Sequence, residues 1–246
     1  MLSTVIYDTN SLKAKAEKIS VQLGLKASSR KEALKNVSDT EDQYFLKVEE
    51  KSSYLQLGLQ SKTKPIFCNF LEWAANKKKS NLTRCMKGVP ANCSVLDATT
   101  GFGRDSLELA AVSRSVTLIE RIPWMVHLLE EGIKNTTEEP GSSLVKKFNL
   151  IKIDAYDYLL SAQQPSDVVY LDPMFPKTGS ARAKKSIQAL RELTAEDLSD
   201  NLLPLALQHA KKRVIVKRHK NSQHLNQKKP TFSISSRVVR FDVYEV

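Results

Sequence analysis

Carboxylate side chains directly follow or end four short apolar runs in the middle of the chain. They are Asp97, Glu120, Asp154 and Asp172. In a sheet of parallel strands the carboxyl ends of the strands lie at one edge, and ligands bind in the crevice beyond that edge. We therefore expect these four carboxylates to face one ligand site.

The turn after the first run permits a ligand to approach the backbone closely. From Asp97 it reads Asp-Ala-Thr-Thr-Gly-Phe-Gly-Arg-Asp, and Gly101 and Gly103 allow a tight turn. A dinucleotide-binding turn has a third glycine where this chain has Ser106. A carboxylate at Asp97 would also repel a pyrophosphate, so the turn favours a cofactor that carries positive charge.

S-adenosylmethionine has the groups that these carboxylates could bind: an amino group, a sulfonium and a ribose. We expect Asp97 and Asp105 to meet its amino-acid end. Glu120, at the end of the second strand, is expected to hold the two ribose hydroxyls. Asp154 is expected to accept a hydrogen bond from the adenine amine.

The segment Asp172-Pro173-Met174-Phe175 could hold a planar amine for methylation. An exocyclic amine is a poor nucleophile because its lone pair is delocalised into the ring. Asp172 and the carbonyl of Pro173 could accept its two N–H bonds, which localises that lone pair. Phe175 could stack against the base, a contact worth about 1–3 kcal/mol. In-line positioning would supply the rest of the rate, and the reaction requires no metal.

Strand-length apolar runs alternate with amphipathic stretches of helix length from residue 94 onward. The predicted strands are 95–98, 116–119, 150–153, 168–171 and 214–216. The predicted helices are 104–112, 124–134, 155–161 and 195–210. This alternation predicts an α/β fold with a parallel sheet covered on both faces. The runs 232–235 and 237–246 have no helix between them and predict an antiparallel hairpin at one sheet edge.

The N-terminal residues predict a small α/β subdomain with its linker at 1–65, followed by the main domain at 66–246. Strands are expected at 4–7, 44–48 and 54–57, the last two as a hairpin. Helices are expected at 11–23, ended by Gly24, and at 67–75.

Positive charge is concentrated in two segments of a chain whose formal net charge is +11. Residues 51–100 hold eight Lys or Arg and two Asp or Glu, and residues 201–246 hold ten and two. Clustered Lys and Arg neutralise phosphates, so these segments indicate a nucleic-acid partner. We expect no membrane span, secretion signal, metal site or obligate protein partner, and the three cysteines favour reduced thiols in the cytoplasm.

The segment 94–246 resembles a class I S-adenosylmethionine-dependent methyltransferase, a Rossmann-like fold with a seven-stranded sheet. Within that class, the motif Asp-Pro-Met-Phe-Pro at 172–176 and the turn at 97–105 resemble one bacterial family. It is the small-subunit ribosomal RNA guanine-N2 methyltransferase J family, RsmJ. Further matching pieces are Glu120-Arg121, Val216-Lys217-Arg218 and Arg240-Phe241-Asp242-Val243-Tyr244.

The resemblance implies methylation of the N2 amine of a guanosine in 16S rRNA near the decoding region, with S-adenosylhomocysteine as the second product. It implies cofactor contacts at seven positions: Arg104, Asp105, Glu120, Arg121, Asp154, Ala155 and Asp172. We expect phosphate contacts close to the target base from Lys177, Lys184, Lys185, Lys217 and Arg218.

Two other functions remain open from the sequence. One is an N-methyltransferase that acts on DNA or on a protein amide, because the Asp-Pro-x-Phe arrangement suits any planar amine. The other is an RNA-binding protein that keeps the fold without catalysis. The intact Asp172, Pro173 and Phe175 weigh against the second alternative.

Overall fold

The computed structural model describes residue 2 and residues 4–36, 43–60, 62–76, 80–139, 142–162, 164–173 and 202–246. These residues form two compact units, of which the first contains residues up to 68 together with 127–135. The second unit contains the described residues of 69–126 and 136–246. The predicted boundary at residue 65 stays a prediction. Across the described ranges, no helix combines the length and the hydropathy needed to cross a membrane.

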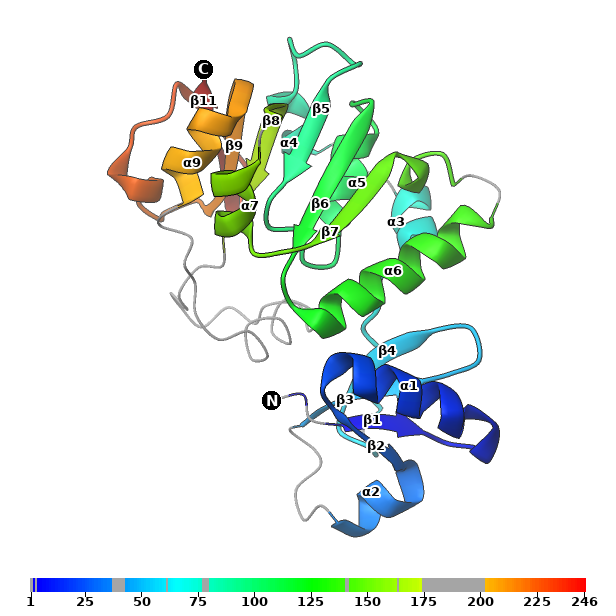
Figure 1. Cartoon of the computed structure of the whole chain (residues 1–246). Coiled ribbons are helices and arrows are strands. Elements are labelled where there is room, and N and C mark those ends of the chain that lie inside the picture. Colours follow the sequence, from blue (N-terminus) through cyan, green and yellow to red (C-terminus); the bar gives the residue numbers. More distant parts are fainter. Residues whose placement is uncertain are drawn as a thin grey trace. The chain divides into compact units, whose positions relative to one another are not determined.

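The second unit is built on one seven-stranded sheet in the order β10-β11-β9-β8-β5-β6-β7 (Figure 1). Its strands are β5 (Ser94–Asp97), β6 (Ser115–Glu120), β7 (Phe148–Lys152), β8 (Ser166–Leu171), β9 (Ala210–His219), β10 (Phe232–Ser235) and β11 (Val239–Glu245). The strands from β9 to β7 pair in parallel, and β11 and β10 pair antiparallel. The predicted mostly parallel sheet with its antiparallel C-terminal hairpin is confirmed.

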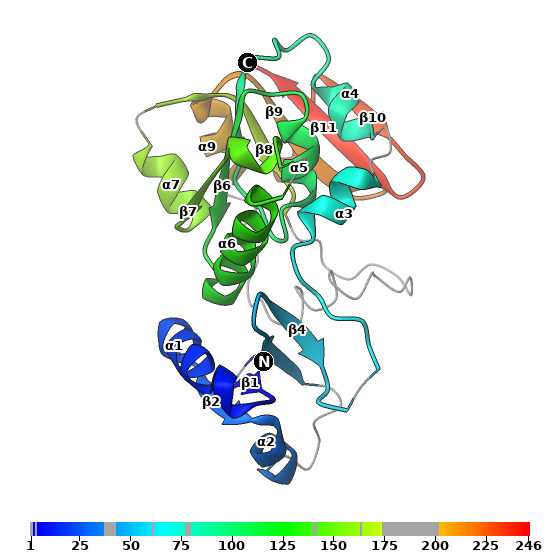
Figure 2. The same ribbon diagram turned by 90° about the vertical axis from the view of Figure 1, so that its right-hand side faces the viewer.

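Helices lie on both faces of this sheet. They are α3 (Phe70–Ala75), α4 (Asn81–Cys85), α5 (Arg104–Ala110), α7 (Ala155–Ser161) and α9 (Leu202–His209). A further helix, α6 (Pro123–Thr137), begins in this unit, but its residues 127–135 belong to the first unit. Seen from the sheet edge, α7 and α9 cover one face, and α3, α4 and α5 cover the other (Figure 2). These layers leave the carboxyl ends of the parallel strands as the edge at which functional side chains can converge.

The core of the second unit explains why its strands could be predicted from the sequence. Val168, Val169, Val214 and Val216 are fully buried. Strands covered by helices on both faces need continuous apolar runs, because neither face contacts water. Leu203 and neighbouring residues of α9 pack against this core.

The first unit is a smaller α/β layer with a four-stranded sheet in the order β2-β1-β3-β4. Its elements are β1 (Thr4–Tyr7), α1 (Lys13–Leu23), β2 (Lys26–Ser29), α2 (Arg30–Asn36), β3 (Tyr44–Val48) and β4 (Ser53–Leu57). Gly24 ends α1 in the left-handed region, with φ of 65°. At the β3–β4 hairpin, the backbone N–H of Ser53 donates to Glu131 of α6 at 2.5 Å.

Some elements were predicted with different bounds or were missed. The first helix begins as a 3₁₀ turn at Asn10–Leu12, and α3 begins at Phe70 because Asn69 caps it by accepting from the N–H of Glu72. β2, α2 and α4 were not predicted. β2 has the sequence Lys-Ala-Ser-Ser, which has no apolar period, and its extended shape comes from parallel pairing with β1.

Candidate active site

Three adjacent parallel strands bring Asp97, Asp172 and Lys217 to the same edge of the sheet. β8 lies between β5 and β9, with Asp97 opposite Tyr170 and Leu171 opposite Val216. Asp172 directly follows β8, so this register places it beside Lys217, the next residue of β9. Asp97 and Asp172, two of the four carboxylates named from the sequence, therefore lie at adjacent strand ends.

Lys217 forms the centre of a charged cluster at this edge. Its Nζ donates to Asp105 Oδ2 at 2.6 Å and to Asp172 Oδ2 at 2.7 Å. Burial opposes the charge on Lys217, but the two carboxylates outweigh it and raise the pKa of the ammonium above its usual value. Lys217 therefore stays a cation that two carboxylates share.

The phenol of Tyr170 is the fourth group of this cluster. Its OH donates to Asp105 Oδ2 at 2.5 Å, and the side chain is fully buried. Burial, followed by the charges of Asp105 and Asp172, raises the pKa of Tyr170 well above its usual value. Tyr170 is thus a neutral donor that fixes Asp105 on α5.

The turn after β5 holds the start of the Asp172 segment. The backbone N–H of Asp172 donates to Thr99 Oγ1 at 2.6 Å. The adjacent Pro173 is buried. The backbone and the carboxylate of Asp172 are therefore each held, by Thr99 and by Lys217.

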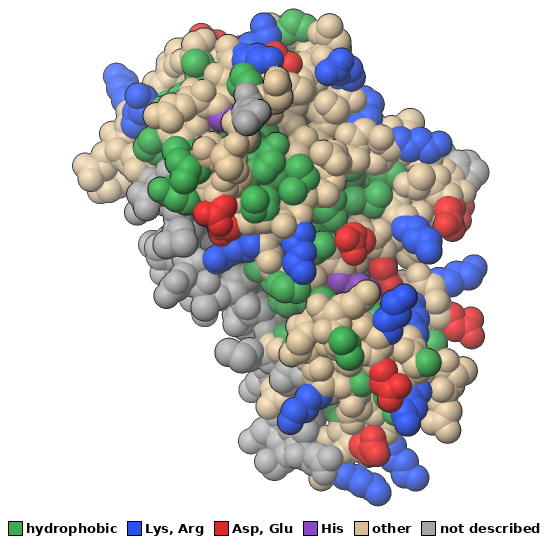
Figure 3. Space-filling view, in the orientation of Figure 1, with side chains coloured by type: hydrophobic (Ala, Val, Ile, Leu, Met, Phe, Trp, Pro, Cys, Tyr) green, Lys and Arg blue, Asp and Glu red, His purple; other side chains and the backbone are tan. Residues whose placement is uncertain are grey.

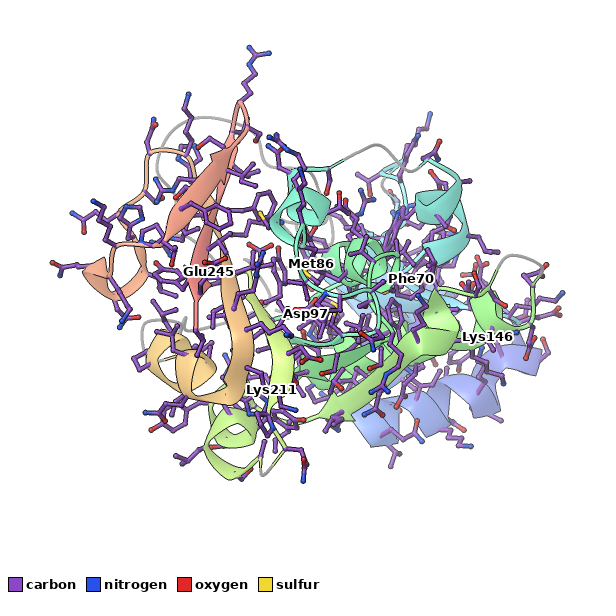
Figure 4. All side chains as sticks on the ribbon, turned by 90° about the horizontal axis from the view of Figure 1, so that it is seen from above. Phe70, Met86, Asp97, Lys146, Lys211 and Glu245 are labelled. Atoms are coloured by element: carbon purple, nitrogen blue, oxygen red, sulfur yellow. The ribbon has the colours of Figure 1, made fainter. Side chains whose placement is uncertain are left out.

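Asp97 is buried among the side chains in the middle of the second unit (Figure 4). Its Oδ2 accepts from Ser106 Oγ at 2.5 Å, and its Oδ1 accepts from the backbone N–H of Thr99 at 3.1 Å. Burial raises the pKa of Asp97 to about 7, and the nearby Asp105 and Asp172 act in the same direction. Both oxygens of Asp97 therefore shape the turn.

Glu120 links the first turn to the second at the end of β6. Its Oε2 accepts from the N–H of Gly101 at 3.1 Å, and its Oε1 accepts from the N–H of Ile122 at 2.9 Å. Gly101 and Gly103 have φ values of 55° and 75°, so the turn uses the left-handed freedom of glycine. Burial raises the pKa of Glu120, and these backbone N–H groups offset part of that effect. A carboxylate oxygen accepts more than one hydrogen bond, so Glu120 can also bind hydroxyls.

The remaining predicted cofactor residues flank these two turns. Asp154 caps α7 by accepting from the N–H of Tyr156 at 2.8 Å, and Ala155 is the first residue of that helix. Arg121 lies 3.6 Å from Asp154 as a partly exposed ion pair. Arg104, at the start of α5, stacks its guanidinium over the ring of Trp73 at 4.5 Å from the centroid.

A family model described as "Putative SAM-dependent methyltransferase" matches residues 29–246. A protein named ribosomal RNA small subunit methyltransferase J from Tolumonas auensis is 39% identical over 76% of this chain and 80% of its own length. The protein of the same name from Nitrosococcus oceani is 39% identical over 73% of this chain and 76% of its own length. The chain belongs to this methyltransferase family.

Two further comparisons bear on the extent of the likeness. The ribosomal RNA small subunit methyltransferase J of Aeromonas salmonicida is 44% identical, and the match spans 61% of this chain and 62% of that protein. The crystal structure of a SAM-dependent methyltransferase from Neisseria gonorrhoeae superposes with a TM-score of 0.71 at 26% identity. It covers 99% of this chain and 96% of that chain, so the whole fold is that of the methyltransferase.

The donor set at the strand edge of this methyltransferase fits S-adenosylmethionine. The carboxylates of Asp105, Asp154 and Glu120 are fixed by backbone, tyrosine or cation partners around the two turns. Fixed carboxylates suit both the hydroxyls and the positive charges of this cofactor. Gly101 and Gly103 have positive φ values at the point where the chain turns into α5, so no side chain fills the space beside the backbone there.

The predicted residues of the site differ in how the structure places them. Asp105, Asp172 and Lys217 are brought together, and Glu120 lies at the end of β6 as expected. Phe175, Lys177, Lys184 and Lys185 lie outside the described residues. Arg218 donates through Nε and Nη2 to the carbonyl of Gln223 at 3.2 and 3.0 Å. Because Nζ of Lys217 binds two carboxylates, its placement favours a role in the site over contact with phosphate.

Three residues of the site were missed from the sequence: Thr99, Ser106 and Tyr170. Tyr170 carried a usable signal, because a buried hydroxyl within an apolar strand requires a hydrogen-bond partner. Ser106 was noted only as the place of an absent glycine, although its hydroxyl binds Asp97. Over the described residues, no group of His, Cys, Asp or Glu side chains is arranged to hold a metal ion.

Proposed function

We propose that this enzyme transfers a methyl group from S-adenosylmethionine to the exocyclic N2 amine of a guanosine in the RNA of the small ribosomal subunit. The relatives named above are small-subunit rRNA methyltransferases by name, and this supports the RNA substrate. The observation that carries the proposal is the Asp172 carboxylate, held at the strand edge by Lys217 at 2.7 Å.

The cofactor supplies an electrophilic methyl group attached to a sulfonium. We assign its binding to the two turns, with Glu120 at the ribose and Asp154 at the adenine. Asp105 would meet its amino-acid end, and Arg104, Arg121, Gly101, Gly103 and Ala155 would line the same edge. Asp97 supports this arrangement from inside by holding Thr99 and Ser106.

Asp172 is assigned as the acceptor that orients the target amine. An N–H bond donated to a carboxylate returns electron density to the nitrogen and fixes the direction of its lone pair. The carbonyl of Pro173 would accept the second N–H, and Phe175 would stack on the guanine ring. With the amine, methyl group and sulfur in line, positioning supplies most of the rate.

Lys217 is assigned as the residue that positions Asp172. Its ammonium holds Oδ2 of Asp172 and favours the ionised carboxylate, because an adjacent opposite charge stabilises the charged form. An ionised Asp172 accepts the N–H bonds of the amine, whereas a protonated one would donate a hydrogen bond to it. The proton that leaves the methylated amine passes to solvent. No metal is required for any of these roles.

Labelled methyl transfer tests the proposal directly. Small ribosomal subunits from cells lacking this protein are incubated with the enzyme and methyl-labelled cofactor, and the RNA is digested to nucleosides. We expect label in N2-methylguanosine at one position of 16S rRNA, with Asp172→Asn as the inactive control. Label in DNA or protein, or none with cofactor bound, would overturn the RNA assignment. A ribosomal substrate would also place the enzyme in the cytoplasm.

A further inference from the structure

Positive side chains gather where β9 ends and β11 begins, one residue beyond the Lys217 cluster. Arg218 pairs with Arg240 across these strands, and Lys220 donates its backbone N–H to the carbonyl of Val238 at 2.9 Å. Lys220 and Arg237 are both exposed. Two loops, at 219–224 and 236–238, therefore present positive charge at the edge of the sheet that carries Asp172.

The loop at 219–224 is held in shape by two arginines. Arg218 donates twice to the carbonyl of Gln223, at 3.2 and 3.0 Å. Arg240 donates to the carbonyl of Lys220 at 2.9 Å and to that of Ser222 at 3.1 Å. A loop tied at three carbonyls loses less conformational entropy when it binds a partner.

A buried carboxylate anchors this loop from inside. Asp242 is completely buried, and its Oδ1 accepts from Arg240 Nε at 2.7 Å and from Ser233 Oγ at 2.6 Å. His224 Nδ1 lies 3.0 Å from its other oxygen. Burial would raise the pKa of Asp242, but the hydrogen bonds from Arg240, Ser233 and His224 lower it below its usual value. Asp242 therefore stays ionised and fixes Arg240 beneath the loop.

No carboxylate neutralises the exposed charges of the two loops within the described C-terminal residues. Residues 202–240 contain no Asp or Glu, Asp242 is buried, and Glu245 pairs with Arg213 at 3.3 Å near the opposite end of β9. On the face shown in Figure 3, by contrast, Lys and Arg side chains lie among Asp and Glu side chains. The charged side chains of the two loops, Lys220 and Arg237, are therefore positive without an acidic residue between them in the sequence.

We propose that the loops 219–224 and 236–238 form a docking surface for the phosphate backbone of the RNA whose base enters the Asp172 site. This inference rests on the proposed function and adds the location of the RNA contact. Arg218 follows Lys217 directly along β9, so a strand of RNA at the site would pass these loops. Lys220 and Arg237 would contact phosphates, and Arg240 with Asp242 would position the loop. Phosphate contacts orient a nucleic acid without reading its sequence.

A matched pair of double variants tests this surface. Lys220→Gln with Arg237→Gln removes two exposed charges from the loops. Lys211→Gln with Lys212→Gln removes two exposed charges from the start of β9, at the opposite edge of the sheet. All four side chains are exposed, so both variants should fold like the parent protein.

Binding to naked 16S rRNA and to small ribosomal subunits is measured over a range of salt concentrations. We expect Lys220→Gln with Arg237→Gln to reduce the salt slope of binding by about 2, and the control pair to leave it unchanged. The control pair should also leave the rate of methyl transfer at saturating subunits unchanged. Equal slopes for the two variants would overturn the proposal. A loss seen with subunits but not with naked rRNA would assign the surface to a ribosomal protein and also overturn it.

These outcomes separate the two proposals. If the parent enzyme binds RNA with the expected slopes but transfers no label to it, the proposed function fails and the docking surface stands. If it methylates the RNA and the loop variant binds like the parent, the docking surface fails and the proposed function stands. Arg240→Lys keeps the positive charge but loses the fork of hydrogen bonds that holds the loop. It should therefore lower the affinity for RNA and leave the salt slope nearly unchanged.

Discussion

The carboxylates of Asp242 and Asp172 are both held by a cation, but their surroundings differ. Asp242 has a side chain that is 0% exposed, and Arg240 binds it through two nitrogens at 2.7 and 2.9 Å. Asp172 has a side chain that is 31% exposed, and it shares Lys217 with Asp105. Asp242 therefore has a cation of its own in the interior, whereas the partly exposed Asp172 shares its cation with Asp105.

We expect this difference to separate an ion pair that stabilises the fold from one that contacts the substrate. A buried carboxylate whose charge is fully matched stabilises one conformation and has no access to a substrate. Two carboxylates around one ammonium keep a net negative charge among the three groups, which suits a substrate that donates N–H bonds or carries positive charge. The comparison predicts that substitutions at Asp172 change the rate, and that substitutions at Asp242 change stability.

The largest effect on rate is expected from Asp172→Asn. The amide keeps the size of the side chain, but it loses the charge and presents an NH₂ group that can only donate. We expect kcat to fall by about 100-fold or more, because the target amine loses its orientation. Thermal unfolding should shift little, since the side chain is partly exposed. Turnover like that of the parent would remove Asp172 from the mechanism.

A smaller loss is expected from Lys217→Met, which keeps the length of the side chain without its charge. Without the Lys217 ammonium, the nearby carboxylates of Asp97 and Asp105 should make the carboxyl group of Asp172 bind a proton more readily. We expect kcat to fall by about tenfold or more, and the acid limb of its pH profile to move to higher pH.

Lys217→Arg serves as the control for this prediction. It should restore the position of the acid limb, because the charge is retained, even if the rate recovers only in part. A pH profile of Lys217→Met that matches the parent enzyme would show that Lys217 has only a structural role. A lower salt slope of RNA binding would instead support the phosphate contact expected from the sequence.

The sequence predicted the strands of this site better than its side-chain contacts. β8 is continuously buried at 168–171, so its apolar run predicted a strand, and Asp172 directly follows the end of that strand. The bond from Lys217 to Asp105 joins residues that are 112 positions apart, and the bond to Asp172 spans 45. No local pattern encodes such a contact, because it follows from the strand order and the register of β8 with β9.

The contacts of Lys217 could not be predicted from the sequence. A basic pair at the end of a strand predicted two phosphate contacts, yet the two neighbours point to different partners. Lys217 binds carboxylates and Arg218 binds a backbone carbonyl. Side chains alternate between the faces of a strand, and only the packed sheet determines which neighbour meets the site.

Asp242→Asn should reduce stability while leaving the rate at saturating substrate nearly unchanged. Removing one charge of a buried pair leaves Arg240 uncompensated, at a cost of about 3 kcal/mol in the free energy of unfolding. The folded pKa of Asp242 is depressed, so its contribution is present above the unfolded pKa and is lost as pH falls through the folded value. Urea unfolding should show this acid loss below about pH 4 in the parent and not in the variant.

Asp97→Asn should change the pH dependence of stability in the opposite direction. The folded pKa of Asp97 is raised to about 7, so the folded state holds a proton that the unfolded state has lost. Stability of the parent should therefore fall as pH rises from about 4 to about 7, and this component should be absent in the variant. Identical curves for the two proteins between these pH values would contradict the burial of an ionisable Asp97.

A double-mutant cycle on Asp172 and Lys217 tests the central claim most directly. Single-turnover methyl transfer to small ribosomal subunits is measured for the parent, Asp172→Asn, Lys217→Met and the double variant. If Lys217 acts through Asp172, the loss caused by Lys217→Met should nearly vanish in the Asp172→Asn background. The same loss in both backgrounds would show that the two residues act independently and would contradict the account.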